Sequence, residues 1–213
     1  HLFSVLAFAL ALVAMPSCDK DTPNRPEGSK SGSFLITTNV VNADGASGVS
    51  YFQTVGKMEG SVDNSQALPA GFGVPPLVIG HHIFVLPDYM GSTKSVLTHY
   101  VKDNSGHLVE RGTLALPANS GASNVVLASE EKAYLSMQNL GIVMEFNPTT
   151  MQKVRDIDLN ALAQPEVRVA PGAMVVRDGL LFVGLNQFDS QWMPHLKQAE
   201  VAIIDTKAGK LLK

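Results

Sequence analysis

The chain has 213 residues, with 16 Lys or Arg, 19 Asp or Glu, and a formal net charge of −3. This balance excludes a broadly basic surface of the kind that binds nucleic acid. Hydrophobic residues make up 45% of the sequence and charged residues only 16%, so the chain can fill a hydrophobic core.

The N-terminal segment has the pattern of a secretory signal. Residues 2–15 form an apolar, uncharged run that is too short to span a bilayer comfortably. The run ends at Pro16-Ser17-Cys18, which contains the only cysteine of the chain. We therefore predict a signal peptide over residues 1–17 and lipidation of Cys18. The alternative is an ordinary free thiol at the end of a signal sequence.

Residues 18–33 follow as the lipidated cysteine and a flexible tether. Pro, Gly, Ser and charged residues dominate this stretch, and such a composition cannot build a core. The third predicted region is a folded domain over residues 34–213.

A repeated hydrophobic pattern indicates the fold of that domain. Three runs begin at Ile83, Ala133 and Leu181, at intervals of 133 − 83 = 50 and 181 − 133 = 48 residues, and a weaker match begins at Phe34. A period of roughly 40–50 residues, with about four strands per repeat, is typical of β-propeller blades. We predict an all-β propeller with about four blades present, as a fragment of a seven- or eight-bladed ring. A small open sandwich is the alternative.

Strand boundaries follow from turn signals between the apolar runs. In the last repeat, Asp178-Gly179 marks a tight hairpin turn. In the repeat that begins near Leu77, Gly80-His81-His82 is expected to turn the first hairpin. Residues 158–164 are expected to form one short helical turn between blades. The predicted strands of the last two repeats are residues 124–128, 133–137, 142–146, 154–159, 174–176, 180–185, 200–204 and a strand from 210.

Propeller geometry places the loops between second and third strands on the same face as the connectors between blades. These loops are long here, over residues 86–94 and 186–198, and the connectors cover 67–73 and 161–172. Elaborate loops on one face of a rigid scaffold are the usual place for a binding site. We therefore expect the ligand on this face.

The same loops carry aromatic and cationic side chains, which together suit a flat, anionic, aromatic ligand. The alternative is that Phe188 and Trp192 only pack the long loop onto its blade. The predicted ligand-binding residues are Tyr89, Met90, Lys94, Arg168, Phe188, Trp192, Met193, His195 and Lys197.

Other polar residues are weaker candidates. Adjacent strand residues such as His81 and His82 point to opposite faces, and the neighbouring sequence offers no third ligand, so we predict no metal site. His99 and His107 are expected to be isolated and solvated. The sequence has no phosphate-binding glycine loop, serine elbow or zinc His-Glu motif. We therefore predict no catalytic residue and no enzymatic activity.

The segment Pro16-Ser17-Cys18-Asp19-Lys20-Asp21, the strand Phe34-Leu35-Ile36-Thr37-Thr38-Asn39 and the blade pattern resemble a family of Bacteroidota surface lipoprotein propellers associated with TonB-dependent ferric siderophore uptake. The resemblance implies a lipid anchor in the outer membrane, exposed at the cell surface. It implies a ferric siderophore as ligand, with iron present only within that complex, and a TonB-dependent transporter as partner. We predict no resident cofactor, and the net charge of −3 excludes nucleic acid as a partner.

Two other functions remain open at this point. One is a propeller scaffold for protein–protein interaction in the envelope. The other is a secreted carbohydrate-active enzyme, which would need paired acids or histidines in a central funnel.

Overall fold

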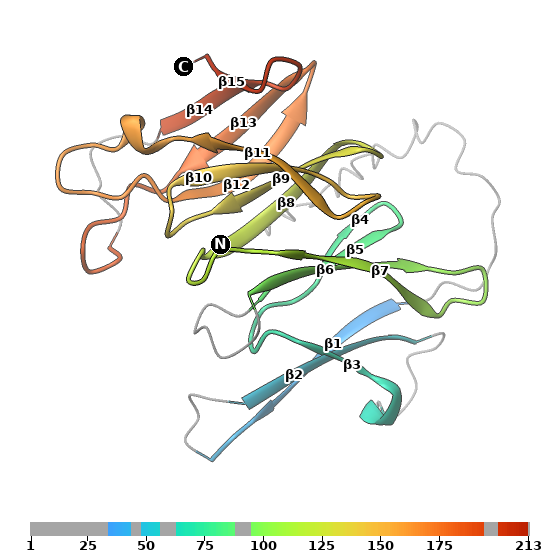
Figure 1. The fold of residues 1–213 in the computed structure, drawn as a ribbon. Coiled ribbons are helices and arrows are strands. Elements are labelled where there is room, and N and C mark those ends of the chain that lie inside the picture. The colour runs from blue at the N-terminus through green and yellow to red at the C-terminus, as the bar shows by residue number, and fades with distance from the viewer. Residues whose placement is uncertain (1–33, 44–47, 56–62, 88–94, 194–199, 213) are drawn as a thin grey trace, which may run out of the picture. The chain divides into compact units, whose positions relative to one another are not determined.

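The computed structural model describes residues 34–43, 48–55, 63–87, 95–193 and 200–212 (Figure 1). The predicted signal peptide, Cys18 and the tether lie outside these ranges. Within them the chain forms antiparallel sheets and two short 3₁₀ turns, and no α-helix is present. No helix in the described part of the chain has the length and apolar character to cross a membrane.

The strands form four sheets, each built from consecutive strands. Sheet 1 contains β1 (Phe34–Val41), β2 (Gly48–Val55) and β3 (Leu68–Ala70). Sheet 2 contains β4 (Leu77–Ile79), β5 (His82–Val85), β6 (Val96–Lys102) and β7 (Leu108–Ala115). Sheet 3 contains β8 (Ala122–Ser129), β9 (Lys132–Met137), β10 (Ile142–Asn147) and β11 (Gln152–Asp158). Sheet 4 contains β12 (Pro171–Arg177), β13 (Leu180–Leu185), β14 (Glu200–Asp205) and β15 (Lys210–Leu211). The 3₁₀ turns are η1 (Asn64–Gln66) and η2 (Asn160–Leu162).

The predicted hydrophobic runs are the second strands of sheets 2, 3 and 4, and β9 shows why they are apolar throughout. Side chains alternate between the two faces of a strand. Ala133 and Leu135 of β9 pack in one core with Phe84 of sheet 2, whereas Tyr134 packs in another core with Leu181 of sheet 4. Both faces of sheet 3 are therefore covered by a neighbouring sheet, which removes any need for a polar face.

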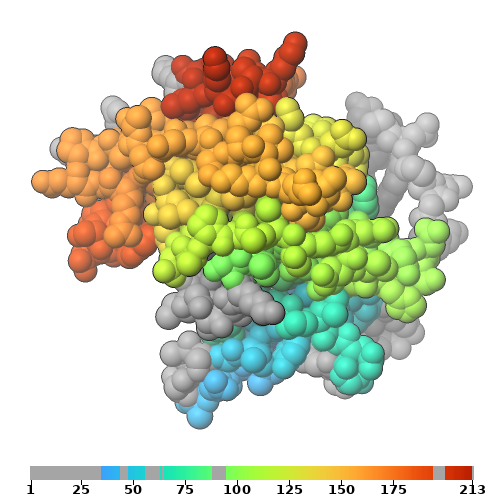
Figure 2. Space-filling view, in the orientation of Figure 1, coloured from blue at the N-terminus to red at the C-terminus, as the bar shows by residue number. Residues whose placement is uncertain are grey.

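The first strands of successive sheets also touch, β4 with β8 and β8 with β12. Figure 2 shows residues of consecutive sheets next to one another in chain order, from cyan through green and yellow to orange. Because no strand pairs with a strand of another repeat among the described residues, the open-sandwich alternative is wrong. The fold is an all-β propeller with about four blades.

Several predicted boundaries need correction. The first hairpin of sheet 2 turns at Gly80 and His81, and His82 already belongs to β5. The expected connector over residues 67–73 contains β3, which pairs with β2. The short helical turn expected within residues 158–164 is present as η2.

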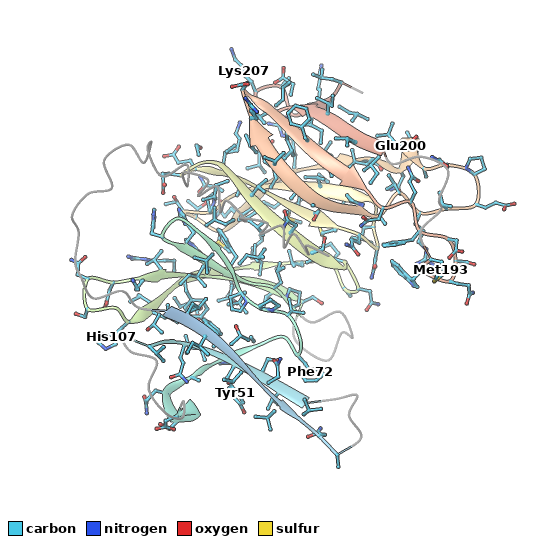
Figure 3. The ribbon with its side chains drawn as sticks, turned by 180° about the vertical axis from the view of Figure 1, so that it is seen from behind. Tyr51, Phe72, His107, Met193, Glu200 and Lys207 are labelled. Atoms are coloured by element: carbon cyan, nitrogen blue, oxygen red, sulfur yellow. The ribbon has the colours of Figure 1, made fainter. Side chains whose placement is uncertain are left out.

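The two ends of sheet 4 carry different kinds of loop. At one end of β13, Leu185 pairs with Pro171 and with Glu200, so the blade connector and the long insertion both emerge there. At the other end, Leu180 pairs with Arg177 and Asp205, next to the tight turns. Figure 3 shows Met193 and Glu200 toward one end of this sheet and Lys207 at the other. The predicted sorting of loops by face is confirmed for this sheet.

A buried carboxylate joins sheet 3 to the last turn of sheet 4. The Glu145 side chain is 3% exposed, with Arg155 Nε 3.1 Å from Oε2 and Lys132 Nζ 3.8 Å from Oε1. The same two cations also donate to carbonyl oxygens of sheet 4, Arg155 to Ala208 at 3.1 Å and Lys132 to Thr206 at 2.9 Å. The carboxylate thus holds both cations where they tie the two blades together.

Candidate functional site

The connector before sheet 4 and the insertion after β13 run antiparallel to each other. The amide of Arg168 donates to the Phe188 carbonyl at 2.7 Å, and the amide of Phe188 donates back to Arg168 at 3.0 Å. Gln187 and Asn186 continue this pairing by donating to Val169 and Ala170. Two segments separated in sequence therefore form one backbone unit at the long-loop face.

That pairing brings four of the predicted ligand-binding residues together, Arg168, Phe188, Trp192 and Met193, which we call the aromatic platform. The guanidinium carbon of Arg168 lies 4.7 Å from the centroid of the Trp192 ring. The Phe188 and Trp192 ring centroids are 5.9 Å apart. Trp192 is 43% exposed and Met193 is 61% exposed. The platform therefore presents apolar surface and a positive charge to solvent.

The charge of Arg168 is available to a ligand. Within the described ranges no carboxylate pairs with its guanidinium, and the partner of this cation is the Trp192 ring. A cation over an aromatic face is worth about 0.5–2 kcal/mol, depending on desolvation. An anion can therefore approach the guanidinium without displacing a competing ion pair.

Asp189 holds the turn that carries Trp192. Its Oδ1 accepts hydrogen bonds from the backbone amides of Gln191 at 2.8 Å and Met193 at 2.9 Å. The Asp189 amide donates to the Met193 carbonyl at 2.9 Å, and the Trp192 amide donates to the Asp189 carbonyl at 3.1 Å. An aspartate that caps its own turn in this way fixes the loop backbone locally.

The same two segments contain left-handed backbone at non-glycine residues. Positive φ angles of 66°, 45°, 49° and 60° occur at Glu166, Ala170, Gln187 and Trp192, four of the seven such residues in the described chain. This conformation costs roughly 1–2 kcal/mol for an L-residue. Such strain persists only where the surroundings impose it, and it is common at ligand sites.

The Gln187 side chain links the segments that carry the platform through hydrogen bonds. This side chain is buried, and Oε1 accepts from the Gln164 amide at 3.3 Å. Its Nε2 donates to the Leu162 carbonyl at 3.1 Å and to Glu200 Oε2 at 2.5 Å. One side chain therefore fixes the connector, the insertion and the start of β14 relative to one another.

The remaining predicted ligand-binding residues, Tyr89, Met90, Lys94, His195 and Lys197, lie outside the described residues, as does Cys18. Trp192 is 43% exposed and Phe188 is half-buried, so the ligand-binding roles of these two residues stay predictions beside the packing alternative.

A histidine cluster at the opposite, tight-turn face was missed by the sequence reasoning. The expectation that His99 is solvated is wrong, because it is buried with Nε2 2.9 Å from Nδ1 of His82. The prediction that His107 is solvated is confirmed, since its side chain is 80% exposed, but the residue is not isolated, because its Nδ1 lies 3.8 Å from Asp103 Oδ2.

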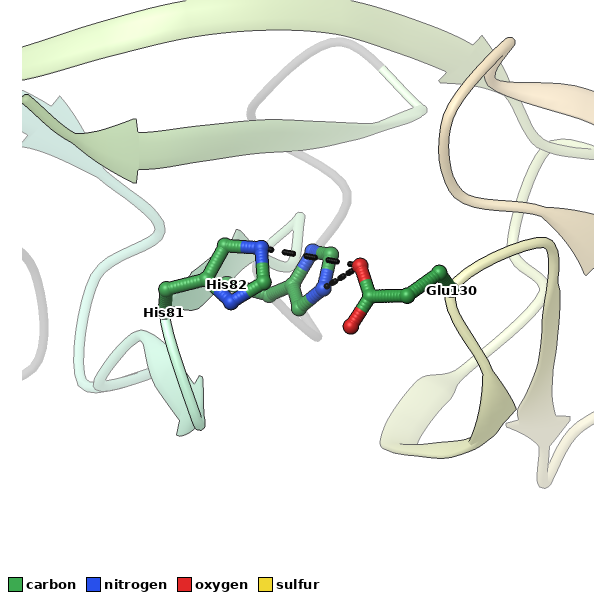
Figure 4. Close-up of side chains that lie close together, drawn as sticks. All are labelled: His81, His82 and Glu130. Carbon is green, nitrogen blue, oxygen red and sulfur yellow. Dashed lines mark hydrogen bonds and ion pairs between the residues drawn. The ribbon is translucent and has the colours of Figure 1, made fainter.

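A third potential ligand also lies beside the His81-His82 pair, contrary to the expectation. Glu130 comes from the β8–β9 turn of the next blade, and Figure 4 shows its carboxylate facing both rings. His81 lies in the turn before β5, so the rule that adjacent strand side chains point to opposite faces does not apply to it. The repeat spacing could have indicated this contact, because 130 − 81 = 49 residues place Glu130 and His81 in equivalent turns of adjacent blades.

Comparison with known proteins adds a set of distant structural likenesses. No family model matches the chain, and no curated protein sequence matches it. A proposed 6-phosphogluconolactonase from Bacteroides fragilis is similar at 13% identity and a TM-score of 0.42, over 87% of this chain and 68% of that one. A protein of unknown function from Bacteroides caccae is similar at 12% identity and a TM-score of 0.43, over 86% and 67%.

A virginiamycin B lyase from Staphylococcus aureus is similar at 8% identity and a TM-score of 0.40, over 82% of this chain and 60% of that one. Each TM-score lies below 0.5, so we assign the class of the protein from its own four sheets and not from these likenesses. It is an all-β propeller-type protein with an aromatic, cationic loop cluster on one face.

Proposed function

We propose that this protein is a binding protein that captures a flat, anionic, aromatic ligand at the aromatic platform, namely a ferric siderophore of the catecholate type. In this proposal, Cys18 carries a lipid anchor at the outer-membrane surface, and the ligand passes to a TonB-dependent transporter. The observation that carries the proposal is the Arg168 guanidinium, stacked on an exposed Trp192 ring with no carboxylate partner among the described residues.

The chemistry of the platform matches that ligand class. A catecholate ring can stack on the exposed indole and on Met193, while its anionic oxygens face the guanidinium. Arg168 suits this role better than a lysine would, because a planar guanidinium both stacks on an aromatic ring and pairs with oxyanions. The ligand would keep the Arg168–Trp192 contact and add a charge-assisted one.

The platform supports binding in preference to catalysis. Arg168, Phe188, Trp192 and Met193 offer stacking, dispersion and a fixed charge, and none of these side chains exchanges a proton near neutral pH. Asp189, the nearest carboxylate in the described loop, accepts backbone amide hydrogens and is engaged in shaping the turn. Binding without chemical change is the function that these groups serve best.

Calorimetric titration of the full chain with a ferric tris-catecholate complex tests the proposal. Arg168→Gln should weaken affinity at least 10-fold, or about 1.4 kcal/mol, because the charge-assisted contact is lost. Arg177→Gln is the matched control, since Arg177 is an exposed arginine of the tight-turn face. Ferric citrate, an anion without aromatic rings, should bind more weakly than the catecholate complex. Equal losses in the two variants, or equal binding of the two complexes, would remove the platform from the proposal.

A further inference from the structure

The tight-turn face holds a second cluster that the aromatic platform does not use. His81 lies in the β4–β5 turn, His82 begins β5, and Glu130 lies in the equivalent turn of the next blade. These residues line an open cavity of about 610 Å³, together with His99, Lys102, Arg111 and Thr149. The cluster therefore joins two blades at the end of the molecule opposite the platform.

From this geometry we infer that His81, His82 and Glu130 bind a divalent transition-metal ion, Zn²⁺ by donor chemistry, with an open coordination position toward the cavity. Glu130 Oε2 lies 3.2 Å from His82 Nε2 and 3.6 Å from His81 Nε2, and the ligand atoms of all three residues lie within 4.8 Å of one another (Figure 4). Tetrahedral zinc with bonds of about 2.0–2.1 Å separates its ligands by about 3.3 Å. The two separations from Glu130, 3.2 and 3.6 Å, are close to that value, and the two histidine ligand atoms lie within 4.8 Å of each other.

His82 is oriented as a metal ligand. Its side chain is 5% exposed and stacks on Phe84, with ring centroids 5.9 Å apart and planes at 4°. Nδ1 of His82 faces Nε2 of His99 at 2.9 Å, so Nε2 of His82 points at Glu130. When His82 donates from Nδ1 to His99, Nε2 carries the lone pair that a metal needs. A histidine held through its second nitrogen in this way is the usual arrangement around protein zinc.

His99 is the positioning residue of this site. It is buried and stacks on Phe84 at a centroid distance of 4.8 Å. When His82 donates from Nδ1, Nε2 of His99 is the acceptor, 2.9 Å away. Nδ1 of His99 has no hydrogen bond of normal geometry in the described chain.

The charges around the cavity indicate what fills the open position. Zn²⁺ with one carboxylate ligand, Glu130, and two imidazole ligands keeps a net positive charge, and Arg111 lines the same cavity. The open position therefore suits an anionic ligand, such as hydroxide, a carboxylate or phosphate.

The test uses untagged full chain, stripped with a chelator and titrated with Zn²⁺ against a chromophoric chelator. We expect saturation at one Zn²⁺ per chain. Glu130→Gln should weaken affinity at least 10-fold, and because this side chain is 71% exposed, the variant should fold normally. Glu131→Gln in the same turn and His107→Ala, an exposed histidine, are the controls and should leave the affinity unchanged. Equal affinity in Glu130→Gln and Glu131→Gln, or no saturable binding by the parent chain, would overturn the inference.

A second measurement addresses the coordination directly. Co²⁺ in place of Zn²⁺ should give the visible absorption bands of a four-coordinate N/O site, and Glu130→Gln should shift or abolish them. His99→Leu should weaken Zn²⁺ binding roughly 10-fold, and His99→Gln, which restores an acceptor, should recover part of it. An octahedral Co²⁺ spectrum that none of these variants changes would mean adventitious binding elsewhere on the chain, and it would contradict the inference.

Discussion

Replacing Asp189 with Ala should weaken ligand binding although its carboxylate is engaged with the backbone of its own turn. The change removes two accepted hydrogen bonds, from the amides of Gln191 and Met193 at 2.8 and 2.9 Å. Each hydrogen bond contributes about 1 kcal/mol at a solvent-accessible position, so the closed turn loses about 2 kcal/mol of stabilising free energy. The left-handed backbone conformation of Trp192, with φ of 60°, costs free energy in the closed turn, so it also favours opening. A cost of about 2 kcal/mol sets a ceiling of roughly 30-fold on the loss of affinity, and we expect a loss of roughly 5- to 30-fold.

The assay combines calorimetric binding of the ferric catecholate complex with acrylamide quenching of Trp192, the only tryptophan of the chain. In Asp189→Ala, quenching of the ligand-free protein should become faster, because the ring is less well held. Asp189→Asn keeps an acceptor oxygen and should stay within about 3-fold of the parent affinity. An Asp189→Ala variant with parent affinity and parent quenching would refute the reasoning that this turn positions the platform.

Two further predictions concern the joint between sheets 3 and 4. Arg155→Ala should lower the free energy of unfolding, measured by denaturant titration, by about 2–3 kcal/mol. The reason is that the buried Glu145 carboxylate then keeps only one cation, Lys132, at 3.8 Å. The double variant Arg155→Ala, Glu145→Gln should recover part of the loss. A loss below about 0.5 kcal/mol would show that the carboxylate finds water instead. Burial, reinforced by Glu145, raises the pKa of Tyr134 from 10.0 to about 12, so its stabilising contribution is complete below pH 10 and is lost as the pH rises toward 12. Tyr134→Phe should reduce that alkaline loss in denaturant titrations, and an identical pH profile in both proteins would contradict the assignment.

Local sequence signals were sufficient for the apolar second strand of sheet 4. The run at Leu180–Leu185 was predicted with its observed bounds: Leu181, Val183 and Leu185 are buried against sheet 3, and the alternate residues on the other face are half-buried. The Asp178-Gly179 turn was also predictable, because a two-residue hairpin needs positive φ at both positions, and the observed values are 51° and 76°.

Contacts between strands and between blades could be predicted only in part. The repeat period placed the connector of Arg168 and the loop of Trp192 on one face, and the structure confirms that they meet. The His82–His99 contact depends on the register of β5 with β6, in which His82 pairs with Val101 and Phe84 pairs with His99. Residues 86–95 separate these strands in the sequence, a spacing for which no turn rule specifies the register. Glu130 was missed because its partners belong to another blade.

The most direct test of the proposed function is an anomalous-diffraction map, measured at the iron absorption edge, from crystals of the full chain with the ferric catecholate complex. We predict one strong peak beside the Arg168 guanidinium and the Trp192 ring, on the long-loop face of sheet 4. A peak at any other surface, or no peak at a ligand concentration that saturates the protein in solution, would contradict the assignment of the platform as the ligand site.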